Sequence, residues 1–229
     1  MVLIAERAHP DDPGFKVGLH WRKRFGIPWL RFRGHNAYLE AFIWRYKWVS
    51  EHCAGKDLLD VPCGMGWGTS LITGCSTIAG VDVSEEAIVE ARHRYGKLAN
   101  FHVGSMASLD FPDHSFDVIA CLEGIEHVSR DVAQHFIGEA HRILRDGGTL
   151  LLSSPYCKNG KHSGNPHHVY EYQPDEIHAL LRPRFDIEVS AERAVDNLTV
   201  LFLRARRIGI PPGDATAPES GPATDRTPN

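Results

Sequence analysis

The stretch Leu58-Leu59-Asp60-Val61-Pro62-Cys63-Gly64-Met65-Gly66-Trp67-Gly68 decides the fold of this 229-residue chain. An apolar run ends in an acid, and a loop with glycines at alternate positions follows it. Glycine lets a backbone turn tightly and approach a ligand closely. The stretch therefore predicts a strand over residues 57–62 whose carboxyl end opens into a ligand-binding loop.

A second apolar run, Ile78-Ala79-Gly80-Val81-Asp82, also ends in an acid. A nucleotide-binding βαβ unit places at this position the carboxylate that binds the ribose hydroxyls. The hydrophobic pattern predicts strands at residues 57–62, 76–82, 99–103, 115–122, 149–154, 184–191 and 197–205. Helices are predicted at residues 35–52, from about 67, and at 84–97, 129–145 and 174–181. This alternation indicates an α/β fold with a Rossmann-like, seven-stranded, mostly parallel sheet and helices on both faces.

The composition divides the chain into three segments. Residues 1–34 form an irregular N-terminal segment in which basic and aromatic residues interleave and Pro and Gly interrupt any long helix. This segment could close over an acceptor as a lid, or it could simply pack on the domain as a cap. Residues 35–207 form the main domain. Residues 208–229 are rich in Pro, Gly, Ala, Thr and Ser, which predicts a disordered tail.

The overall charge gives no general case for a nucleic-acid partner, because the formal net charge is −4 and the pI is near 6.4. Five scattered cysteines without a CxxC pair argue against a disulfide framework and favour a reducing cytoplasm. The sequence contains no apolar stretch of membrane-spanning length. We therefore expect a cytoplasmic protein that acts away from membranes.

The two acid-ended strands and the glycine loop resemble the cofactor site of class I S-adenosylmethionine (SAM) methyltransferases. The resemblance extends to Phe111-Pro112-Asp113-His114-Ser115-Phe116-Asp117-Val118 and to Leu144-Arg145-Asp146-Gly147-Gly148-Thr149-Leu150. The glycine spacing also favours SAM over a dinucleotide. The cofactor-binding residues that the resemblance implies are Asp60, Gly64, Gly66, Gly68, Asp82, Ser105, Met106 and Glu123. Ser105 stands where this family usually carries an acid for the adenine amino group.

A second motif, Glu123-Gly124-Ile125-Glu126-His127, follows the strand at 115–122. If a helix starts here, its two carboxylates and its imidazole share one face and could bind a divalent cation. The alternative is that these side chains only cap the helix or pack locally.

The later element Asn165-Pro166-His167-His168-Val169-Tyr170-Glu171-Tyr172 favours a metal. It resembles the His-x-aromatic-Glu-aromatic element of small-RNA 2′-O-methyltransferases, and the E-x-x-E-H motif is also similar to that of ubiquinone-biosynthesis O-methyltransferases. The resemblance implies magnesium or manganese bound by Glu123, Glu126, His127 and His168. Candidate catalytic residues are His127, His167, His168 and Glu126, since neutral histidine can act as a general base near pH 7.

The expected function is SAM-dependent methylation of a hydroxyl on a sugar, polysaccharide or similar polyol, assisted by a divalent metal. Within that class the chain looks similar to bacterial sugar O-methyltransferases of the mycobacterial polysaccharide type. The alternatives are an RNA-terminal 2′-O-methyltransferase, a quinone or aromatic O-methyltransferase, and a SAM-binding scaffold without activity. The expected partner is a small-molecule or oligosaccharide acceptor, nucleic acid is disfavoured by the charge, and a homodimer is compatible with the size.

Overall fold

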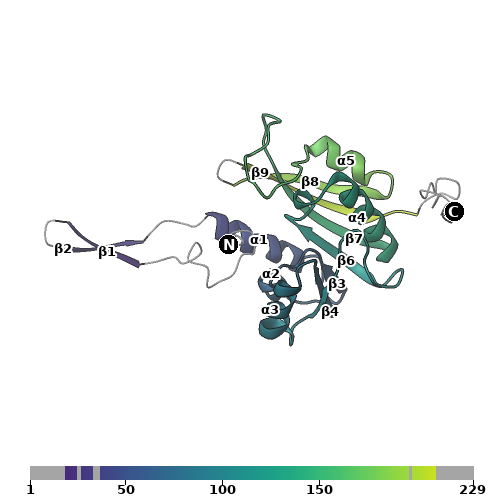
Figure 1. Ribbon diagram of the computed structural model, residues 1–229, viewed down its shortest axis with the longest axis horizontal. Coiled ribbons are helices and arrows are strands. Elements are labelled where there is room, and N and C mark those ends of the chain that lie inside the picture. Colours follow the sequence, from purple (N-terminus) through teal and green to yellow (C-terminus); the bar gives the residue numbers. More distant parts are fainter. Residues whose placement is uncertain (1–18, 25–26, 33–36, 196–197, 210–229) are drawn as a thin grey trace, which may run out of the picture.

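The computed structural model describes residues 19–24, 27–32, 37–195 and 198–209. Its main feature is a seven-stranded sheet in the order β5-β4-β3-β6-β7-β9-β8 (Figure 1). The strands are β3 (Asp57–Asp60), β4 (Thr77–Asp82), β5 (Asn100–Val103), β6 (Phe116–Leu122), β7 (Leu144–Tyr156), β8 (Phe185–Val195) and β9 (Leu198–Arg207). Strands β3 to β7 are parallel, and β9 runs antiparallel to both β7 and β8. The mostly parallel sheet is the one that the sequence predicts.

The strand order reverses beside β3, which has β4 on one side and β6 on the other. Ligands of open α/β sheets bind at such a reversal, beyond the carboxyl ends of the strands. The chain places Asp60 at the end of β3, Asp82 at the end of β4 and Glu123 directly after β6. The topology therefore gathers the three acids that the sequence singles out at one edge of the sheet.

Helices cover both faces of the sheet, as Figure 1 shows. They are α1 (Ala37–Ser50), α2 (Trp67–Ser70), α3 (Glu85–Tyr95), α4 (Arg130–Ile143) and α5 (Pro174–Leu181). One apolar cluster buries Phe136 of α4 and Leu181 of α5 against the sheet residue Leu59. A second cluster buries Val49 of α1 against Leu58, which follows from the alternation of side chains along a strand.

Serine hydroxyls start two of the helices. Ser84 Oγ accepts a hydrogen bond from the backbone N–H of Ala87 at the start of α3. Ser129 Oγ accepts in the same way from Val132 at the start of α4. Both contacts satisfy backbone donors that a helix leaves unpaired, and they match the predicted helix starts.

The glycine loop adopts a conformation that depends on its glycines. Gly64 and Gly66 have φ values of 53° and 77°, in the left-handed region that favours glycine. A Cβ atom on Gly68 would lie 2.0 Å from Cζ of Tyr46. Helix α1 thus packs directly on the loop, and the ring of its Phe42 stacks on Trp67 with centroids 4.6 Å apart.

The described part of the N-terminal segment is not irregular. It contains an antiparallel hairpin of β1 (Leu19–Arg24) and β2 (Ile27–Phe32), which stands away from the sheet in Figure 1. Neither strand keeps a regular alternation of apolar and polar residues, and β2 contains Pro28, so the sequence gives only a weak strand signal here. The rest of residues 1–34, and residues 210–229 of the predicted tail, lie outside the described residues. The lid remains a prediction.

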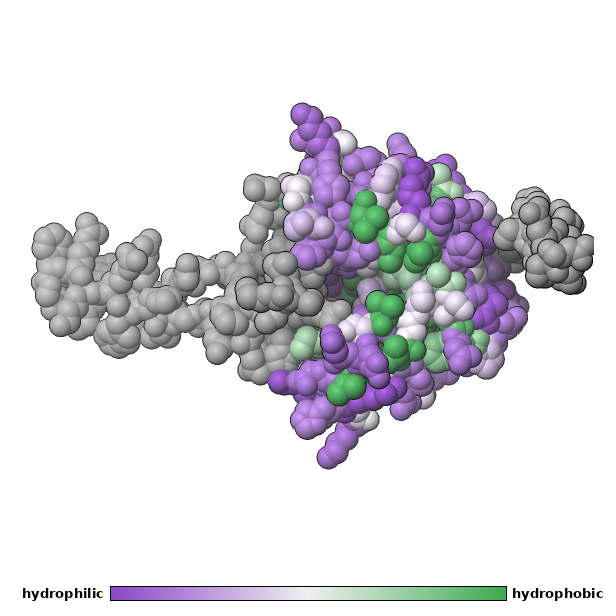
Figure 2. All heavy atoms as spheres, viewed as in Figure 1, coloured by the Kyte–Doolittle hydropathy of each residue, from purple (hydrophilic) through white to green (hydrophobic). Residues whose placement is uncertain are grey.

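The face of the molecule in Figure 2 is mostly hydrophilic, with hydrophobic residues in small separate groups. None of the helices that the structure describes has the length and apolar character needed to cross a bilayer.

Candidate functional site

Asp60 ends β3 as a completely buried carboxyl group. Its Oδ2 accepts a hydrogen bond of 2.6 Å from the Thr69 hydroxyl, and its Oδ1 has no partner within the described part of the chain. Burial raises the pKa of Asp60 to about 7, and the nearby charge of Asp82 also raises it, whereas the Thr69 hydrogen bond opposes both effects. A buried acceptor without a partner is costly, so this atom suits a cationic or hydrogen-bond-donating ligand.

Asp82 ends β4 and ties two backbone segments together. One carboxylate oxygen accepts from the Gly64 N–H at 2.9 Å, and the other accepts from the Ser84 N–H at 2.9 Å. The same side chain therefore shapes the glycine loop and the start of α3. Each carboxylate oxygen has a second lone pair, so Asp82 could also accept from ribose hydroxyls, and this contact stays a prediction.

Apolar side chains lie exposed beside these acids. Val83, directly after Asp82, is 74% exposed, and Val103 at the end of β5 is 48% exposed. Met106 is buried, and Ser105 is exposed with its Oγ accepting from the Ala107 N–H at 3.2 Å. Exposed apolar surface next to a carboxylate is suited to cover the face of a nucleobase.

Glu123 does not lie where the sequence predicts it. No α-helix starts at this motif: residues Ile125–His127 form a single 3₁₀ turn, and Glu123 precedes it with φ of 49°. Its Oε1 accepts from Ser153 Oγ at 2.8 Å, and its Oε2 forms an ion pair with Arg45 Nη2 at 3.2 Å. The expectation of a shared helical face was wrong, because the chain turns in the left-handed region at Glu123 and aims this carboxylate at α1.

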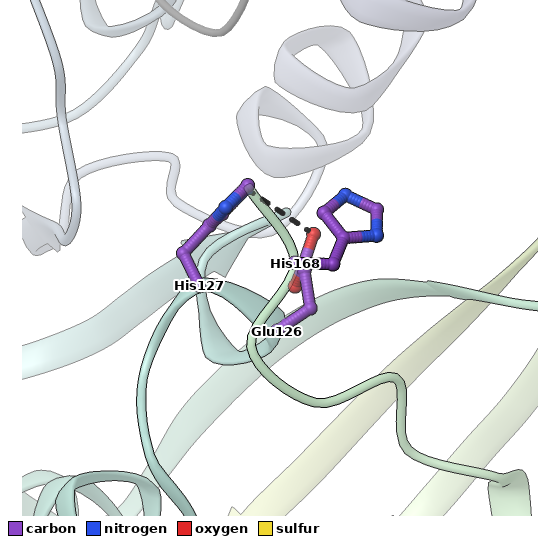
Figure 3. Close-up of side chains that lie close together, drawn as sticks. All are labelled: Glu126, His127 and His168. Atoms are coloured by element: carbon purple, nitrogen blue, oxygen red, sulfur yellow. Dashed lines mark ion pairs between the residues drawn. The ribbon is translucent and has the colours of Figure 1, made fainter. Parts of the chain in front are cut away.

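The structure does bring together Glu126, His127 and His168 (Figure 3). One potential ligand atom from each residue lies within 4.8 Å of the others. Glu126 is completely buried, its Oε1 has no hydrogen-bond partner among the described residues, and this atom lies 3.8 Å from His127 Nε2. Burial, followed by the charge of Glu123, raises the pKa of the Glu126 carboxyl well above its usual range. Three of the four predicted metal ligands therefore converge, and Glu123 is the one outside the group.

Hydrogen bonds orient both imidazoles of this group. His127 Nδ1 donates to the carbonyl of His167 at 3.1 Å, and His168 Nδ1 donates to Glu171 Oε1 at 2.6 Å. Each bond places the proton on Nδ1, so that Nε2 carries the lone pair. Asn165 Nδ2 lies 2.9 Å from His168 Nε2 and can donate to it. Carboxylate and carbonyl partners behind histidine nitrogens are the usual outer shell of protein metal sites.

The loop after β7 is also fixed to the end of β6 through the main chain. The carbonyl of Glu126 accepts from the N–H groups of Val169 and Tyr170, at 2.7 and 3.1 Å. These bonds bring His168 to Glu126 across a large sequence separation. The predicted catalytic candidate His167 contributes its carbonyl to this arrangement, and its side chain is half-buried.

The sequence did not identify two residues that contact the predicted site residues, Arg45 and Glu171. Arg45 sits in a helix that shows only an apolar pattern, so no local signal marks it. Glu171 lies within the His-x-aromatic-Glu-aromatic element, and its spacing from His168 could have identified it as the partner of that imidazole.

Comparison with known proteins finds a family model and several relatives that resemble part of this chain. Residues 59–152 match the family described as "Methyltransferase domain". A probable S-adenosylmethionine-dependent methyltransferase of Mycolicibacterium smegmatis is 35% identical over 149 residues, which cover 62% of this chain and 57% of the relative. A ubiquinone biosynthesis O-methyltransferase of Thiobacillus denitrificans is 32% identical over 117 residues, which cover 48% of this chain and 50% of the relative. The chain thus spans little more than half the length of these relatives.

Among solved structures, the N-methyltransferase NodS from Bradyrhizobium japonicum, bound to S-adenosylhomocysteine, has a TM-score of 0.64 and 18% identity. The match covers 80% of this chain and 92% of NodS. At this identity the likeness concerns the fold, which agrees with the seven-stranded sheet described above.

Proposed function

Because residues 59–152 match the methyltransferase domain family and the nearby relatives are named as SAM-dependent methyltransferases, we propose that this chain is a class I SAM-dependent methyltransferase that transfers the methyl group of SAM to a hydroxyl oxygen of a sugar or similar polyol. The observation that supports an oxygen acceptor is the group of Glu126, His127 and His168, which could hold a metal ion. Glu126 and His127 come shortly after the carboxyl end of β6. The name of the Thiobacillus relative, an O-methyltransferase, points the same way.

The residues present fit the methyl donor. The unpaired Oδ1 of Asp60 suits the ammonium of the amino-acid end, and Asp82 suits the ribose hydroxyls. The open space at Gly64, where a Cβ atom would meet nothing within 4 Å, leaves the loop backbone accessible. Val83 supplies apolar surface for the base.

The residues also fit a divalent cation. A buried carboxylate oxygen without a partner and two imidazoles with oriented Nε2 atoms form a mixed oxygen and nitrogen donor set, which manganese accepts more readily than magnesium does. A bound cation would supply Lewis-acid assistance that makes a hydroxyl a better nucleophile at neutral pH. Glu126, His127 and His168 would hold it, with Glu123 retained by Arg45.

The reaction is an in-line displacement. A lone pair of the acceptor oxygen attacks the methyl carbon, the C–S bond breaks, and its electrons remain on the sulfur of S-adenosylhomocysteine. The hydroxyl proton passes to a base, for which the Glu126 carboxylate and an imidazole of the group are candidates. The chain's task is to hold the hydroxyl in line with the methyl group and to accept this proton.

A second candidate is methylation of a phenolic or quinone-derived hydroxyl, which the name of the Thiobacillus relative favours. Adjacent hydroxyls of a catechol present the same pair of oxygens as a sugar diol. Methylation at an RNA end is a weaker candidate, because the chain carries a formal net charge of −4 and a phosphate backbone is held mainly by basic side chains.

The deciding experiment incubates the protein with isotopically labelled SAM and three acceptor classes: neutral oligosaccharides, catechols and short RNA. Chelator is added to one half of each set, and manganese or magnesium is then restored. We expect labelled methyl ether on an oligosaccharide, loss with chelator and recovery with manganese. Label on catechol alone would show that the acceptor is a phenolic hydroxyl rather than a sugar. Full activity in the presence of chelator would show that the reaction needs no metal. If calorimetry detects no binding of S-adenosylhomocysteine, the proposed function is overturned.

The raised pKa of Asp60 predicts a pH-dependent affinity for S-adenosylhomocysteine. The ligand's ammonium pairs with the ionised carboxylate, whereas the free protein holds a proton there below a pKa of about 7. Affinity should therefore rise about tenfold between pH 6 and pH 8, the range over which the free carboxyl ionises. Calorimetry across this range measures the slope, and Asp60→Asn should abolish it. An equal slope in the variant would assign it to another group.

A further inference from the structure

Arg130 is an exposed cation next to the candidate metal ligands. It is the first residue of α4, shortly after His127 in the chain, and its guanidinium carbon lies 4.9 Å from the centroid of the Tyr170 ring. The backbone N–H of Tyr170 donates to the carbonyl of Glu126 at 3.1 Å. A main-chain contact therefore holds the ring beneath Arg130 next to a candidate metal ligand.

The Arg130 guanidinium is positioned without using its hydrogen-bond donors. It packs on the face of Tyr170, whose hydroxyl is fixed in turn by a hydrogen bond to Glu176 Oε1. Within the described ranges, no oxygen accepts a hydrogen bond from this guanidinium and no carboxylate forms an ion pair with it. Its planar fork of N–H groups is therefore available to a ligand.

Tyr172 supplies a second donor close to Arg130. Its ring lies against that of Tyr170, with the centroids 4.7 Å apart, and the residue is 3% exposed. Its hydroxyl is buried and forms no hydrogen bond in the part of the chain that the structure describes. Burial raises the pKa of Tyr172 to about 12, and the charge of Arg130 opposes this rise, so the two groups lie within electrostatic range. A buried donor without a partner is unfavourable, and a ligand that accepts from it would relieve this cost.

The local charge favours an anion as that ligand. Both unpaired groups are donors, and the N-terminus of the 14-residue helix α4, which carries a partial positive charge, begins at Arg130. Two carboxylates lie nearby. Glu176 already accepts from the Tyr170 hydroxyl, and Asp131 is exposed, so water screens its charge. Direct charge-assisted hydrogen bonds to an anion therefore outweigh this screened repulsion.

We propose that Arg130 and Tyr172 bind an anionic group of the acceptor, so that the substrate is an acidic saccharide carrying a carboxylate or a phosphate. The inference rests on the proposed function, because it places the methylated hydroxyl at Glu126, His127 and His168. Guanidinium groups bind carboxylates and phosphates through paired, charge-assisted hydrogen bonds. A sugar acid presents its anionic group and its hydroxyls from one ring or from adjacent rings, and it can therefore occupy both places.

The test measures kcat/KM with isotopically labelled SAM and three matched acceptors. These are a neutral glucose trisaccharide, the same trisaccharide with one glucuronic acid, and the same trisaccharide with one phosphate ester. We expect the wild-type chain to prefer an acidic form over the neutral one by about 10- to 100-fold, the range for a charge-assisted hydrogen bond. The better acidic acceptor identifies the anion. Arg130→Met should lower kcat/KM for that acceptor to the value for the neutral trisaccharide.

Three further variants sharpen the assignment. Tyr172→Phe removes only the hydroxyl and keeps the buried ring, so it should lower kcat/KM for the acidic acceptor less than Arg130→Met does. Arg130→Lys keeps the charge but not the paired geometry, and its effect should be intermediate. Arg182→Met is the matched control, because Arg182 is an exposed arginine at the end of α5 that takes no part in the proposed site, and this variant should behave as the wild type does.

Each outcome has a separate meaning. If the wild-type chain methylates the neutral and acidic trisaccharides equally well, or if Arg130→Met lowers both rates equally, the anion site is overturned while the proposed function stands. If no trisaccharide is methylated, the saccharide acceptor of the proposed function fails, and the anion site fails with it. The affinity for S-adenosylhomocysteine and the melting temperature, measured for each variant, separate loss of the contact from loss of the fold.

Discussion

Replacing His168 with alanine is expected to lower turnover by about 10²- to 10⁴-fold, the usual range for loss of a group that moves a proton or positions the nucleophile. The variant should also lose saturable binding of manganese. Affinity for S-adenosylhomocysteine should be unchanged, since His168 belongs to the Glu126 and His127 group and not to the glycine loop. Initial rates on the acceptor identified above, together with calorimetry of both ligands, measure the three quantities.

Two further variants control for effects of the substitution that do not involve the metal or the acceptor. His168→Ala leaves the buried Glu171 without its imidazole partner, so His168→Gln, which retains a donor toward Glu171, reports whether that loss alone matters. His135→Ala alters an exposed histidine of α4, whose Nδ1 donates to the carbonyl of Asp131, and should change nothing. Equal losses of turnover and of cofactor affinity in His168→Ala would indicate a folding defect and contradict the assignment.

Replacing Asp82 with alanine should weaken S-adenosylhomocysteine binding by about 1.5–3 kcal/mol, the scale of lost hydrogen bonds to a charged group. The side chain has a double role, because it would bind the ribose and also accepts from the N–H groups of Gly64 and Ser84. Its loss therefore frees the glycine loop as well. Calorimetry gives the affinity, and thermal melting gives the accompanying loss of stability.

Asp110→Ala provides the comparison, as it removes an exposed aspartate from the same domain. Asp82→Asn keeps one acceptor oxygen and should lie between the alanine variant and the wild type. Unchanged affinity in Asp82→Ala would show that the ribose does not contact this carboxylate.

The fold was predictable wherever its determinants are local. Short segments predict the strands that end at Asp60 and Asp82, because each is a continuous apolar run. They also predict the helix starts at Ser84 and Ser129, because each serine caps the helix that follows it. The start of β7 could not be predicted in this way. Gly147-Gly148 favoured a helix end and a strand from residue 149, whereas the strand begins at Leu144.

Contacts that are distant in sequence explain that difference. Arg145 pairs with Asp117 at 2.7 Å and with Asp57 at 3.0 Å, which holds the early part of β7 against its neighbours. Gly147, with φ of 72°, accommodates the irregular pairing there. No local sequence pattern predicts these ion pairs. Tertiary contacts therefore extend the strand beyond the residues that local strand propensity predicts.

The site shows the same division between local and distant causes. The E-x-x-E-H motif predicted Glu126 and His127, and the later His-x-aromatic-Glu-aromatic element predicted His168, but neither predicted the direction of Glu123. That direction depends on a left-handed backbone at Glu123 and on a guanidinium from α1, and neither is encoded in the motif.

The main-chain bonds from Val169 and Tyr170 to the carbonyl of Glu126 have a consequence for how such a domain can diversify. They fix His168 without using the side chains of the preceding exposed residues 158–161. That short stretch can therefore vary in sequence while the imidazoles keep their places. Exchanging it between related proteins should therefore leave the arrangement of Glu126, His127 and His168 intact.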